Sequence, residues 1–427
     1  MSYLHKSNTS TSTSYTLSMW IKTAKTSGTT SSAIFWNGAT NKLVWELNDK
    51  GQIYYYNGSV YRTTAYLRDT HGFYHLVWKV SSGTGTLYIN GNSALIAGNV
   101  SGVGALANGT DIRLGNDGGT DFTGTMAHVH FTDGTAYNPT TFAESDSNGV
   151  WVPKLTPSVS YGSGGFFLKF DNSGNLGLDS SGQGNNLTVN GTMVQAKDTP
   201  TNVHCILNTN DKRFDDTTLT NLGLTVSGGR ISTGFDMIRG TIGADSGKWY
   251  FEMKAADNAE IDQVGIGILN NISMQNNGAS GFNGALQGYG VQMSNGYKVG
   301  VGQSGAAYMG GFTTNDICMI AVDLDNDKIT FGRNGQWANG SGGADQTYAN
   351  STAAFTGLND IRGYIPMFAN RNSGNNNTGI MHFNFGNGQF GTANVTSAGS
   401  NGGGSIFEYD VPSGFYAWNT KNLKDNS

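Results

Sequence analysis

Aromatic side chains beside amides and a cation are the residues of this sequence best suited to binding chemistry. A sugar is bound by an exposed aromatic face with polar partners next to it. Because successive side chains of a strand point to opposite faces, either Tyr55 or the pair Tyr54 and Tyr56 is exposed, and core packing is the alternative use of each ring. The predicted glycan-binding residues are Trp36, Asn37, Tyr54, Tyr55, Tyr56, Asn57, Tyr61 and Arg62.

The acidic residues do not form a pattern for glycoside hydrolysis. Retaining hydrolysis requires two carboxylates about 5–5.5 Å apart. Glu260 and Asp262 begin a Glu-x-Asp-x-x-Glu pattern, but Gly265 occupies the place of the second glutamate. The five glutamates are Glu46, Glu144, Glu252, Glu260 and Glu408. No two of them have a catalytic spacing, so the sequence predicts no catalytic residue and no enzyme.

Two sets of residues could hold a metal ion. Asp171, Asn172 and Asp179 offer the oxygen ligands that Ca²⁺ prefers, and a network of Asx turns is the alternative. His128 and His130 are two apart on a predicted strand, so they share a face, as two transition-metal ligands could. No carboxylate or cysteine lies near them in sequence, which favours ordinary strand positions. Calcium is the only candidate cofactor, and none is certain.

The composition and the alternation of apolar and polar residues predict that strands and turns position these residues. The chain has 427 residues, with 63 glycines but only 6 prolines, 13% charged residues and 11% aromatic residues. This combination excludes collagen and argues against a disordered chain. Residues 15–22 alternate apolar and polar side chains, the pattern of a strand in a sheet with unlike faces. Asn-Gly pairs at 57–58, 90–91, 295–296 and 334–335 predict type I′ hairpin turns. The fold class is all-β.

Charge and hydropathy exclude several classes of binding partner. The net charge is −5, and no cluster of Lys and Arg occurs, so nucleic acid and anionic membranes are poor partners. Residues 1–16 are polar and no later stretch approaches 18 apolar residues, which predicts neither a signal peptide nor membrane insertion. Cys205 and Cys318 are too few for a disulfide framework. A protein made in a cytosol and used outside a cell, as in a virus particle released by lysis, fits these features.

The first half of the chain resembles a laminin-G-like, concanavalin-type lectin domain. Four ordered blocks carry the resemblance: residues 17–22, 74–79, 87–91, and 112–115 followed by 122–126. Residues 170–186 resemble the strand and Asp-Ser-Ser-Gly-x-Gly loop that usually open such a domain, but here they come last. Moving one strand from front to back leaves a sheet intact where the first and last strands are neighbours. The resemblance therefore implies a circularly permuted concanavalin-like sandwich over residues 1–197.

The second half resembles an SPRY domain, a protein-binding module without catalytic residues. The matching segments are residues 246–252, 264–268, 316–325, 328–335 and 383–386. The polar stretch 197–202 is the predicted boundary. The sequence thus predicts two antiparallel jelly-roll sandwiches in tandem, the second spanning residues 203–427 with a C-terminal extension.

The tandem of the two domains is similar to fibre and decoration proteins of tailed bacteriophages. The resemblance implies a noncatalytic virion protein, made in the host cytoplasm, that binds host-surface polysaccharide or other virion proteins and forms a homo-oligomer, with a trimer favoured. Two alternatives remain open. One is a purely structural cement protein of the capsid or tail, and the other is a capsular polysaccharide depolymerase.

Overall fold

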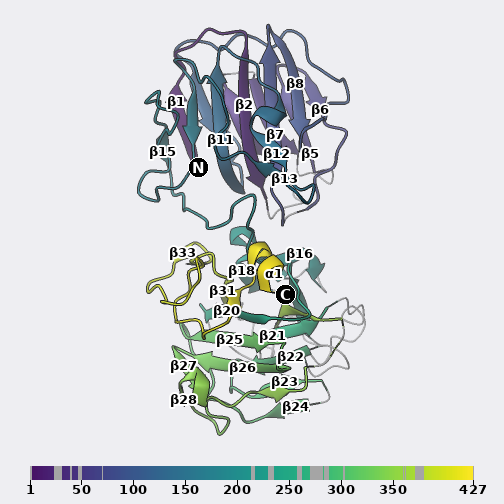
Figure 1. The fold of residues 1–427 in the computed structure, drawn as a ribbon, viewed down its shortest axis with the longest axis vertical. Helices are drawn as coiled ribbons and strands as arrows, with labels where there is room; N and C mark the ends of the chain where they lie inside the picture. The colour runs from purple at the N-terminus through teal and green to yellow at the C-terminus, as the bar shows by residue number, and fades with distance from the viewer. Residues whose placement is uncertain are drawn as a thin grey trace. The chain divides into compact units, whose positions relative to one another are not determined.

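The computed structural model describes most of the chain: residues 2–23, 31–38, 41–46, 51–69, 71–212, 217–228, 235–256, 262–269, 282, 288–301, 303–358, 360, 362–370 and 379–426. The chain divides into two compact units, Met1–Thr201 and Asn202–Ser427 (Figure 1). Each unit consists of sheets whose strand pairings are almost all antiparallel, and the one α-helix of the described residues is α1 (Thr420–Asn426). The all-β prediction is confirmed.

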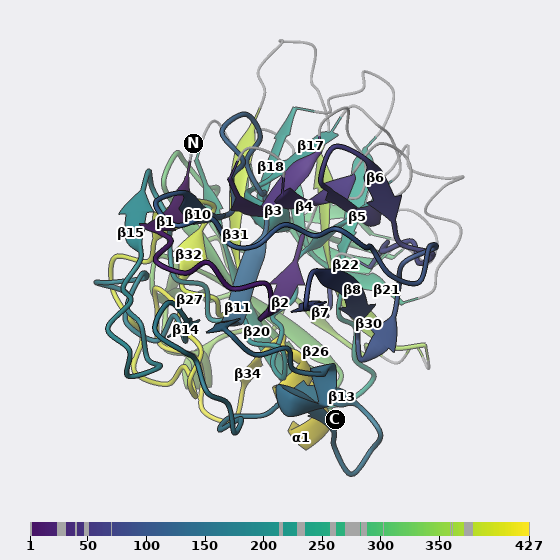
Figure 2. The same ribbon diagram turned by 90° about the horizontal axis from the view of Figure 1, so that it is seen from above.

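The N-terminal unit is a sandwich of two large sheets, called sheet A and sheet B. In order across sheet A, its described strands are β15 (Thr188–Asn190), β1 (Tyr3–Ser7), β10 (Asp111–Leu114), β3 (Ser32–Asn37), β4 (Asn41–Glu46), β5 (Gln52–Tyr56) and β6 (Val60–Arg62). Those of sheet B are β14 (Phe166–Leu168), β11 (Thr125–Asp133), β2 (Tyr15–Lys22), β7 (Tyr74–Ser81), β8 (Thr84–Ile89) and β9 (Asn92–Ser93). Figure 2 shows β3, β4, β5 and β6 following one another along one sheet.

Apolar side chains at alternate positions of β2 form part of the core of this unit. Leu17, Met19 and Ile21 point into one cluster of buried residues between the sheets, as the sequence predicts. The opposite face of β2 is also buried, because the hairpin of β12 (Ala143–Ser145) and β13 (Trp151–Pro153) packs on it. Both faces of sheet B are therefore covered at β2, which leaves the outer face of sheet A as the broad sheet surface of this unit.

The first and last strands of the N-terminal unit are neighbours. β15 pairs with β1, with Val189 opposite Leu4. This adjacency is the arrangement that a circular permutation requires, because a strand can move between the chain ends without changing the sheet.

The C-terminal unit is a second sandwich, of sheets C and D. In order across sheet C, the described strands are β16 (Leu207–Lys212), β19 (Asp236–Gly240), β30 (Tyr364–Asn370), β21 (Gln263–Ile268), β22 (Gly288–Gln292), β23 (Lys298–Gly300) and β24 (Gln303–Ala306). Those of sheet D are β17 (Thr217–Thr220), β18 (Thr225–Gly228), β31 (Ile380–Asn384), β20 (Lys248–Ala255), β25 (Ile317–Asp323), β26 (Lys328–Arg333), β27 (Gln336–Ala338) and β28 (Ala344–Gln346). Two further strands join sheet D: β29 (Phe355–Thr356) pairs with β26, and β34 (Tyr416–Ala417) pairs with β20. β32 (Gln389–Phe390) and β33 (Ala393–Asn394) form a separate two-stranded sheet.

The C-terminal segment of the chain covers part of the outer face of sheet D. Phe407, Val411 and Phe415 pack with Tyr250 and Trp337 in one buried cluster. The segment also returns to the sheet through β34, which runs parallel to β20.

A buried carboxylate holds this segment in place. Both oxygens of Glu252 accept hydrogen bonds: Oε1 from the Tyr250 hydroxyl (3.0 Å) and the Tyr409 N–H (3.0 Å), and Oε2 from the Glu408 N–H (2.9 Å) and the Asn384 amide (3.2 Å). Glu252 is fully buried. Burial raises the pKa of Glu252 to about 7, although the four hydrogen bonds act in the opposite direction.

The hairpin turns bear out the Asn-Gly prediction at two of four places. Both residues of the pairs at 90–91 and 334–335 have positive φ, as a type I′ turn needs. At 57–58 and 295–296 only the glycine has positive φ, so the type I′ assignment is wrong there. The flanking strands differ in register and loop length, which the dipeptide alone does not reveal.

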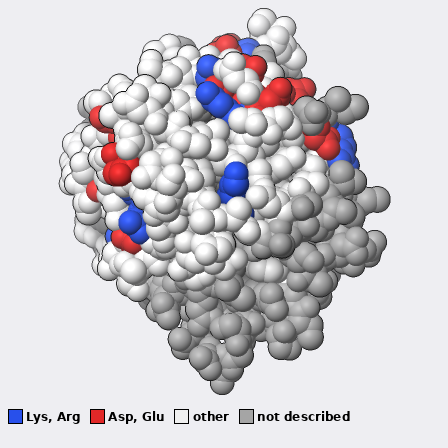
Figure 3. Space-filling view, turned by 90° about the horizontal axis from the view of Figure 1, so that it is seen from below, with Lys and Arg blue, Asp and Glu red and all other residues white. Residues whose placement is uncertain are grey.

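The described surface carries few charges. Figure 3 shows one face of the molecule, on which Lys, Arg, Asp and Glu are sparse among uncharged side chains, consistent with 13% charged residues. Cys205 and Cys318 are both buried. No helix within the described ranges is long and apolar enough to cross a membrane.

Candidate glycan-binding surface

A row of five side chains crosses the outer face of sheet A. Pairing between neighbouring strands places its members directly opposite one another, in the order His5, Arg113, Trp36, Lys42 and Tyr56. The residues next to them along each strand, such as Leu4, Phe35 and Leu43, are buried in the core, so the row lies on the outer face. It spans five strands, or roughly 19 Å at about 4.8 Å per strand. We call it the aromatic–cation row.

Each aromatic ring of this face has a cation beside it. The Arg113 guanidinium carbon lies 4.6 Å from the Trp36 ring centroid and 5.2 Å from that of Tyr3. Lys42 Nζ lies 5.6 Å from the centre of the Tyr56 ring. In the next row, the Arg62 guanidinium carbon lies 5.9 Å from the Tyr54 ring. A cation within about 6 Å of a ring face is attracted to it, so these contacts orient the rings.

Carboxylates neutralise the cations of this face. Arg113 pairs with Asp111 (3.2 Å), Lys42 with Asp117 (2.7 Å), and Arg62 with Glu46 through two bonds of 2.7 and 3.1 Å. These three cations and three carboxylates balance one another in charge. It presents half-buried rings with charged hydrogen-bonding groups between them.

Asp117 is held firmly in its ionised form. Although burial acts to raise it, the pKa of Asp117 falls to about 2, because the Lys42 ammonium and the backbone N–H groups of Thr120 and Gly119 donate to the carboxylate. The Lys42 side chain is thereby fixed between Asp117 and the Tyr56 ring, and this part of the row is already ordered before any ligand arrives.

The structure separates the predicted glycan-binding residues into two groups. Trp36, Tyr54, Tyr56 and Arg62 share the outer face of sheet A, and Asn57 lies in the turn after Tyr56. The other three, Asn37, Tyr55 and Tyr61, point toward the core.

Core packing explains the second group. Tyr55 is 1% exposed, stacks on Trp78 with ring centroids 4.3 Å apart, and donates its hydroxyl to Asn41 Oδ1 (2.8 Å). Tyr61 packs beside Tyr55 against the same cluster. Asn37 is 4% exposed, and its amide has no hydrogen-bond partner in the described part of the chain.

Tyr3, His5, Lys42 and Arg113 belong to the same surface but were not predicted. Their sequence signal is weak, since each is a single polar or aromatic residue with an apolar neighbour in its strand. They reach Trp36 only through strand register, because β1 pairs with β10, and β10 and β4 pair with the two sides of β3.

The proposed calcium ligands form a hydrogen-bonded loop. The two oxygens of Asp179 accept the N–H groups of Phe167 (2.9 Å), Ser181 (2.8 Å) and Asn185 (2.8 Å) and the Ser181 hydroxyl (2.9 Å). Asp171 is exposed, as is Asn172, whose Oδ1 accepts the Gly174 N–H (3.0 Å). These hydrogen bonds are those of Asx turns. The described residues contain no cluster of three or more His, Cys, Asp or Glu side chains, and a calcium site built from Asp171, Asn172 and Asp179 stays a prediction.

His128 and His130 do not form a metal-binding pair. A β-bulge at this point of β11 gives His128 a positive φ of 45° and breaks the regular alternation. His130 is buried, stacks on Phe167 at 3.9 Å and bonds the Tyr161 hydroxyl through Nδ1 (2.8 Å). It is a core residue beneath the segment that covers sheet B.

Buried Ser18 and His75 resemble a serine nucleophile and its base. The hydrogen bond has the opposite direction, however, because the histidine donates and the serine accepts. Trp151 Nε1–H donates to His75 Nδ1 (3.1 Å), so Nε2 carries the hydrogen and donates to Ser18 Oγ (2.8 Å). Burial lowers the pKa of His75 to about 3, and both side chains are inaccessible. The pair therefore stabilises the interior under the β12–β13 hairpin.

Glu260, which begins the incomplete glycosidase pattern of the sequence, lies outside the described residues.

The comparisons with known proteins agree with this fold. A family model described as the concanavalin A-like lectin/glucanases superfamily matches residues 2–141. That span contains every residue of the aromatic–cation row. The matched span and the two stacked sheets agree on a concanavalin-like sandwich fold for this part of the chain.

Several solved structures are similar to this chain. The SPRY domain of human HERC1 is 14% identical, with 42% of this chain and 96% of that one covered at a TM-score of 0.32. A Bacteroides ovatus protein provisionally assigned as carbohydrate-binding is 20% identical, with coverages of 45% and 57% and a TM-score of 0.35. A human SPRY domain is 13% identical, with coverages of 40% and 94% and a TM-score of 0.30. Comparison with curated protein sequences gives no match.

Proposed function

We propose that the N-terminal unit binds a neutral glycan chain across the outer face of sheet A. The observation that carries the proposal is the aromatic–cation row, in which Trp36 and Tyr56 stand on one face, each beside a cation. A sugar ring presents a C–H face to an aromatic ring and hydroxyl groups to polar neighbours. The match of residues 2–141 to a lectin and glucanase superfamily supports the same assignment.

The balance of cations and carboxylates on the outer face of sheet A favours a neutral glycan over an acidic one. Arg113, Lys42 and Arg62 are each paired with a carboxylate, so these three cations are not left for an acidic sugar. The Asp111 carboxylate, whose side chain is 30% exposed, retains lone pairs that can accept sugar hydroxyl groups. A neutral polysaccharide lying perpendicular to the strands would meet Trp36 and Tyr56 in succession.

Binding to a glycan array by the full chain, followed by titration with the best neutral oligosaccharide, tests this proposal. Trp36→Ala and Tyr56→Ala are expected to weaken binding. The matched control is Tyr66→Ala, because Tyr66 is 53% exposed in the same unit and also has a cation at its ring, Arg68 at 5.6 Å. Equal losses in all three variants would show that binding does not depend on the row.

We propose further that the whole protein is a noncatalytic component of a tailed-bacteriophage particle, made in the host cytoplasm. The tandem of lectin-like and SPRY-like sequence blocks supports this role, as does the sparsely charged surface. Host-surface polysaccharide and other virion proteins are then the partners, in a homo-oligomer for which a trimer is the expected state.

Mass spectrometry of purified particles tests the location, and adsorption of particles that lack the protein tests the role. Normal adsorption with reduced particle stability would instead support the cement alternative. Release of reducing ends from host capsular polysaccharide by the pure protein would support the depolymerase alternative and contradict the noncatalytic assignment.

A further inference from the structure

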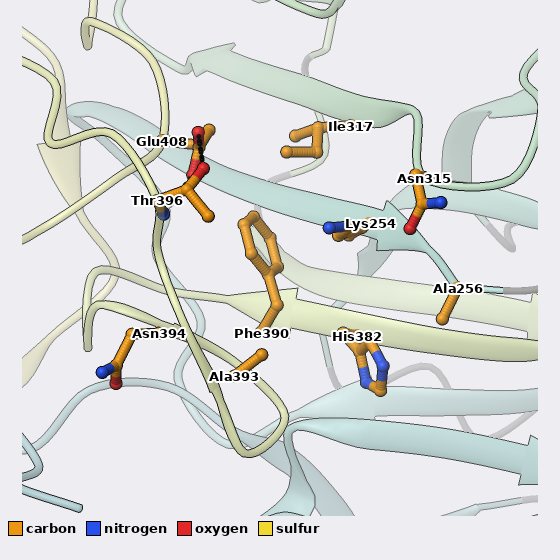
Figure 4. Close-up of a pocket in the computed structure, with 10 residues that line it drawn as sticks. All are labelled: Lys254, Ala256, Asn315, Ile317, His382, Phe390, Ala393, Asn394, Thr396 and Glu408. Carbon is orange, nitrogen blue, oxygen red and sulfur yellow. Dashed lines mark hydrogen bonds between the residues drawn. The ribbon is translucent and has the colours of Figure 1, made fainter.

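A small pocket opens on the outer face of sheet D (Figure 4). Its floor is a cross-strand row in which Lys254 of β20 lies opposite Ile317 of β25 on one side and His382 of β31 on the other. The hairpin of β32 and β33 and Glu408 form the walls. The volume is about 180 Å³, room for about six water molecules. The pocket can take a single small ring or end group rather than a length of polymer.

Lys254 gives the pocket a cation that has no counterion among the described residues. It is half-buried, and the structure shows no ion pair to it from any described residue. Glu408 is the one carboxylate among the lining residues, and its two oxygens accept the Thr396 N–H (2.9 Å) and hydroxyl (2.6 Å). Figure 4 shows Lys254 between Phe390 and Asn315, apart from the bonded pair of Glu408 and Thr396. A partly buried ammonium gains from a carboxylate that pairs with it.

His382 supplies a second donor. Thr225 Oγ1 accepts from the Asn221 amide (2.8 Å) and lies 2.9 Å from His382 Nδ1, a nitrogen to which the Thr225 hydroxyl can donate. In the tautomer that accepts this bond, Nε2 carries the ring hydrogen. Burial, and then the nearby Lys254, lower the pKa of His382, which keeps the ring neutral at pH 7. The ring therefore offers one N–H.

The remaining lining residues suit the body of a ligand. Phe390 provides an aromatic wall, and the side-chain amides of Asn315 and Asn394 provide further donors and acceptors. Cation, N–H donor, aromatic face and amides surround one small volume.

We propose that this pocket binds one uronic-acid-type sugar residue, with its carboxylate on Lys254 and His382 and its ring against Phe390. The site lies within the C-terminal unit and is independent of the neutral-glycan surface proposed above. It gives the SPRY-like half of the chain a ligand of its own.

Isothermal titration of the full chain with sodium glucuronate, and with glucose as the ring that lacks the carboxylate, tests the proposal. Glucuronate is expected to bind once per chain, with glucose at least about tenfold weaker. Lys254→Met keeps the aliphatic stem and removes the charge, and it should weaken glucuronate binding at least about tenfold. Lys421→Met, at an exposed lysine of α1, is the control and should change nothing.

Three results would overturn the proposal: no saturable binding of glucuronate, equal affinity for glucose, or unchanged affinity in Lys254→Met. If that variant does not fold, as judged by its melting temperature, His382→Gln is measured in its place and should also weaken glucuronate binding. If a tetraglutamate peptide binds more tightly than glucuronate, and if that binding depends on Lys254, the ligand of the pocket is an acidic protein segment and not a sugar. Trp36→Ala should leave glucuronate binding intact, which separates this site from the proposed function of sheet A.

Discussion

The buried carboxylate of Glu252 makes the stability of the C-terminal unit depend on pH. The pKa of Glu252 is about 7 in the folded protein, against an ordinary value of 4.5. The folded state therefore binds the proton more tightly than the unfolded state, and ionisation of the carboxyl opposes folding. At about 1.4 kcal/mol per tenfold change in proton affinity, the difference corresponds to about 3 kcal/mol. This contribution is fully present below pH 4.5 and is lost as the pH rises to about 7.

Glu252→Gln isolates that contribution. The amide keeps the volume and one acceptor oxygen but does not titrate, so the variant should lose the fall in stability between pH 5 and pH 8. At pH 5 it should be less stable than wild type by about 1–3 kcal/mol, because an amide NH₂ replaces one of the oxygens that accept hydrogen bonds. At pH 8 the two proteins should be closer in stability.

Urea unfolding of both full-length proteins at pH 5, 6, 7 and 8 measures this effect. Amide exchange of residues 405–418 at each pH assigns it to the segment that Glu252 holds. The difference between wild type and variant removes the contribution of all other titrating groups. A difference that does not change with pH would show that Glu252 is ionised throughout, with its four hydrogen bonds outweighing burial, and would refute the reasoning.

Two further predictions concern the loops and strands. Gly265→Ala should destabilise the C-terminal unit by more than about 2 kcal/mol in a thermal or urea titration, because the new Cβ would lie 2.1 Å from the Tyr289 carbonyl oxygen of the paired strand; a neutral result would mean that β21 and β22 can separate. Asp179→Ala should lower the melting temperature of the N-terminal unit equally with calcium and with chelator, since the carboxylate already accepts four hydrogen bonds. A loss seen only with calcium would restore the metal site.

The sequence predicts the strands well and the site only in part. Period-two alternation along β2 correctly assigns Leu17, Met19 and Ile21 to the core. The same rule shows that Tyr55 and its two neighbours face opposite ways, yet it cannot say which face is covered. That choice depends on Trp78, which stacks on Tyr55 from the other sheet.

The other residues of the glycan-binding surface come together only because strands that are distant in sequence pair in a particular register. Arg113 lies beside Trp36 because β10 pairs with β3, although 77 positions separate them in the chain. No local pattern carries that information. The Asx loop at Asp179 is a different case: its acid and amide residues fit either calcium or turns, and only the positions of the backbone N–H groups distinguish the two.

The central claim is that the aromatic–cation row binds a neutral glycan, and titration of Trp36→Ala tests it most directly. Losing one stacked ring should cost about 2 kcal/mol, from about 50 Å² of buried apolar area and the stacking contribution, or about a 30-fold increase in Kd. Tyr66→Ala should bind as wild type does. Unchanged affinity in Trp36→Ala, with the oligosaccharide still bound once per chain, would place the binding site elsewhere and contradict the account.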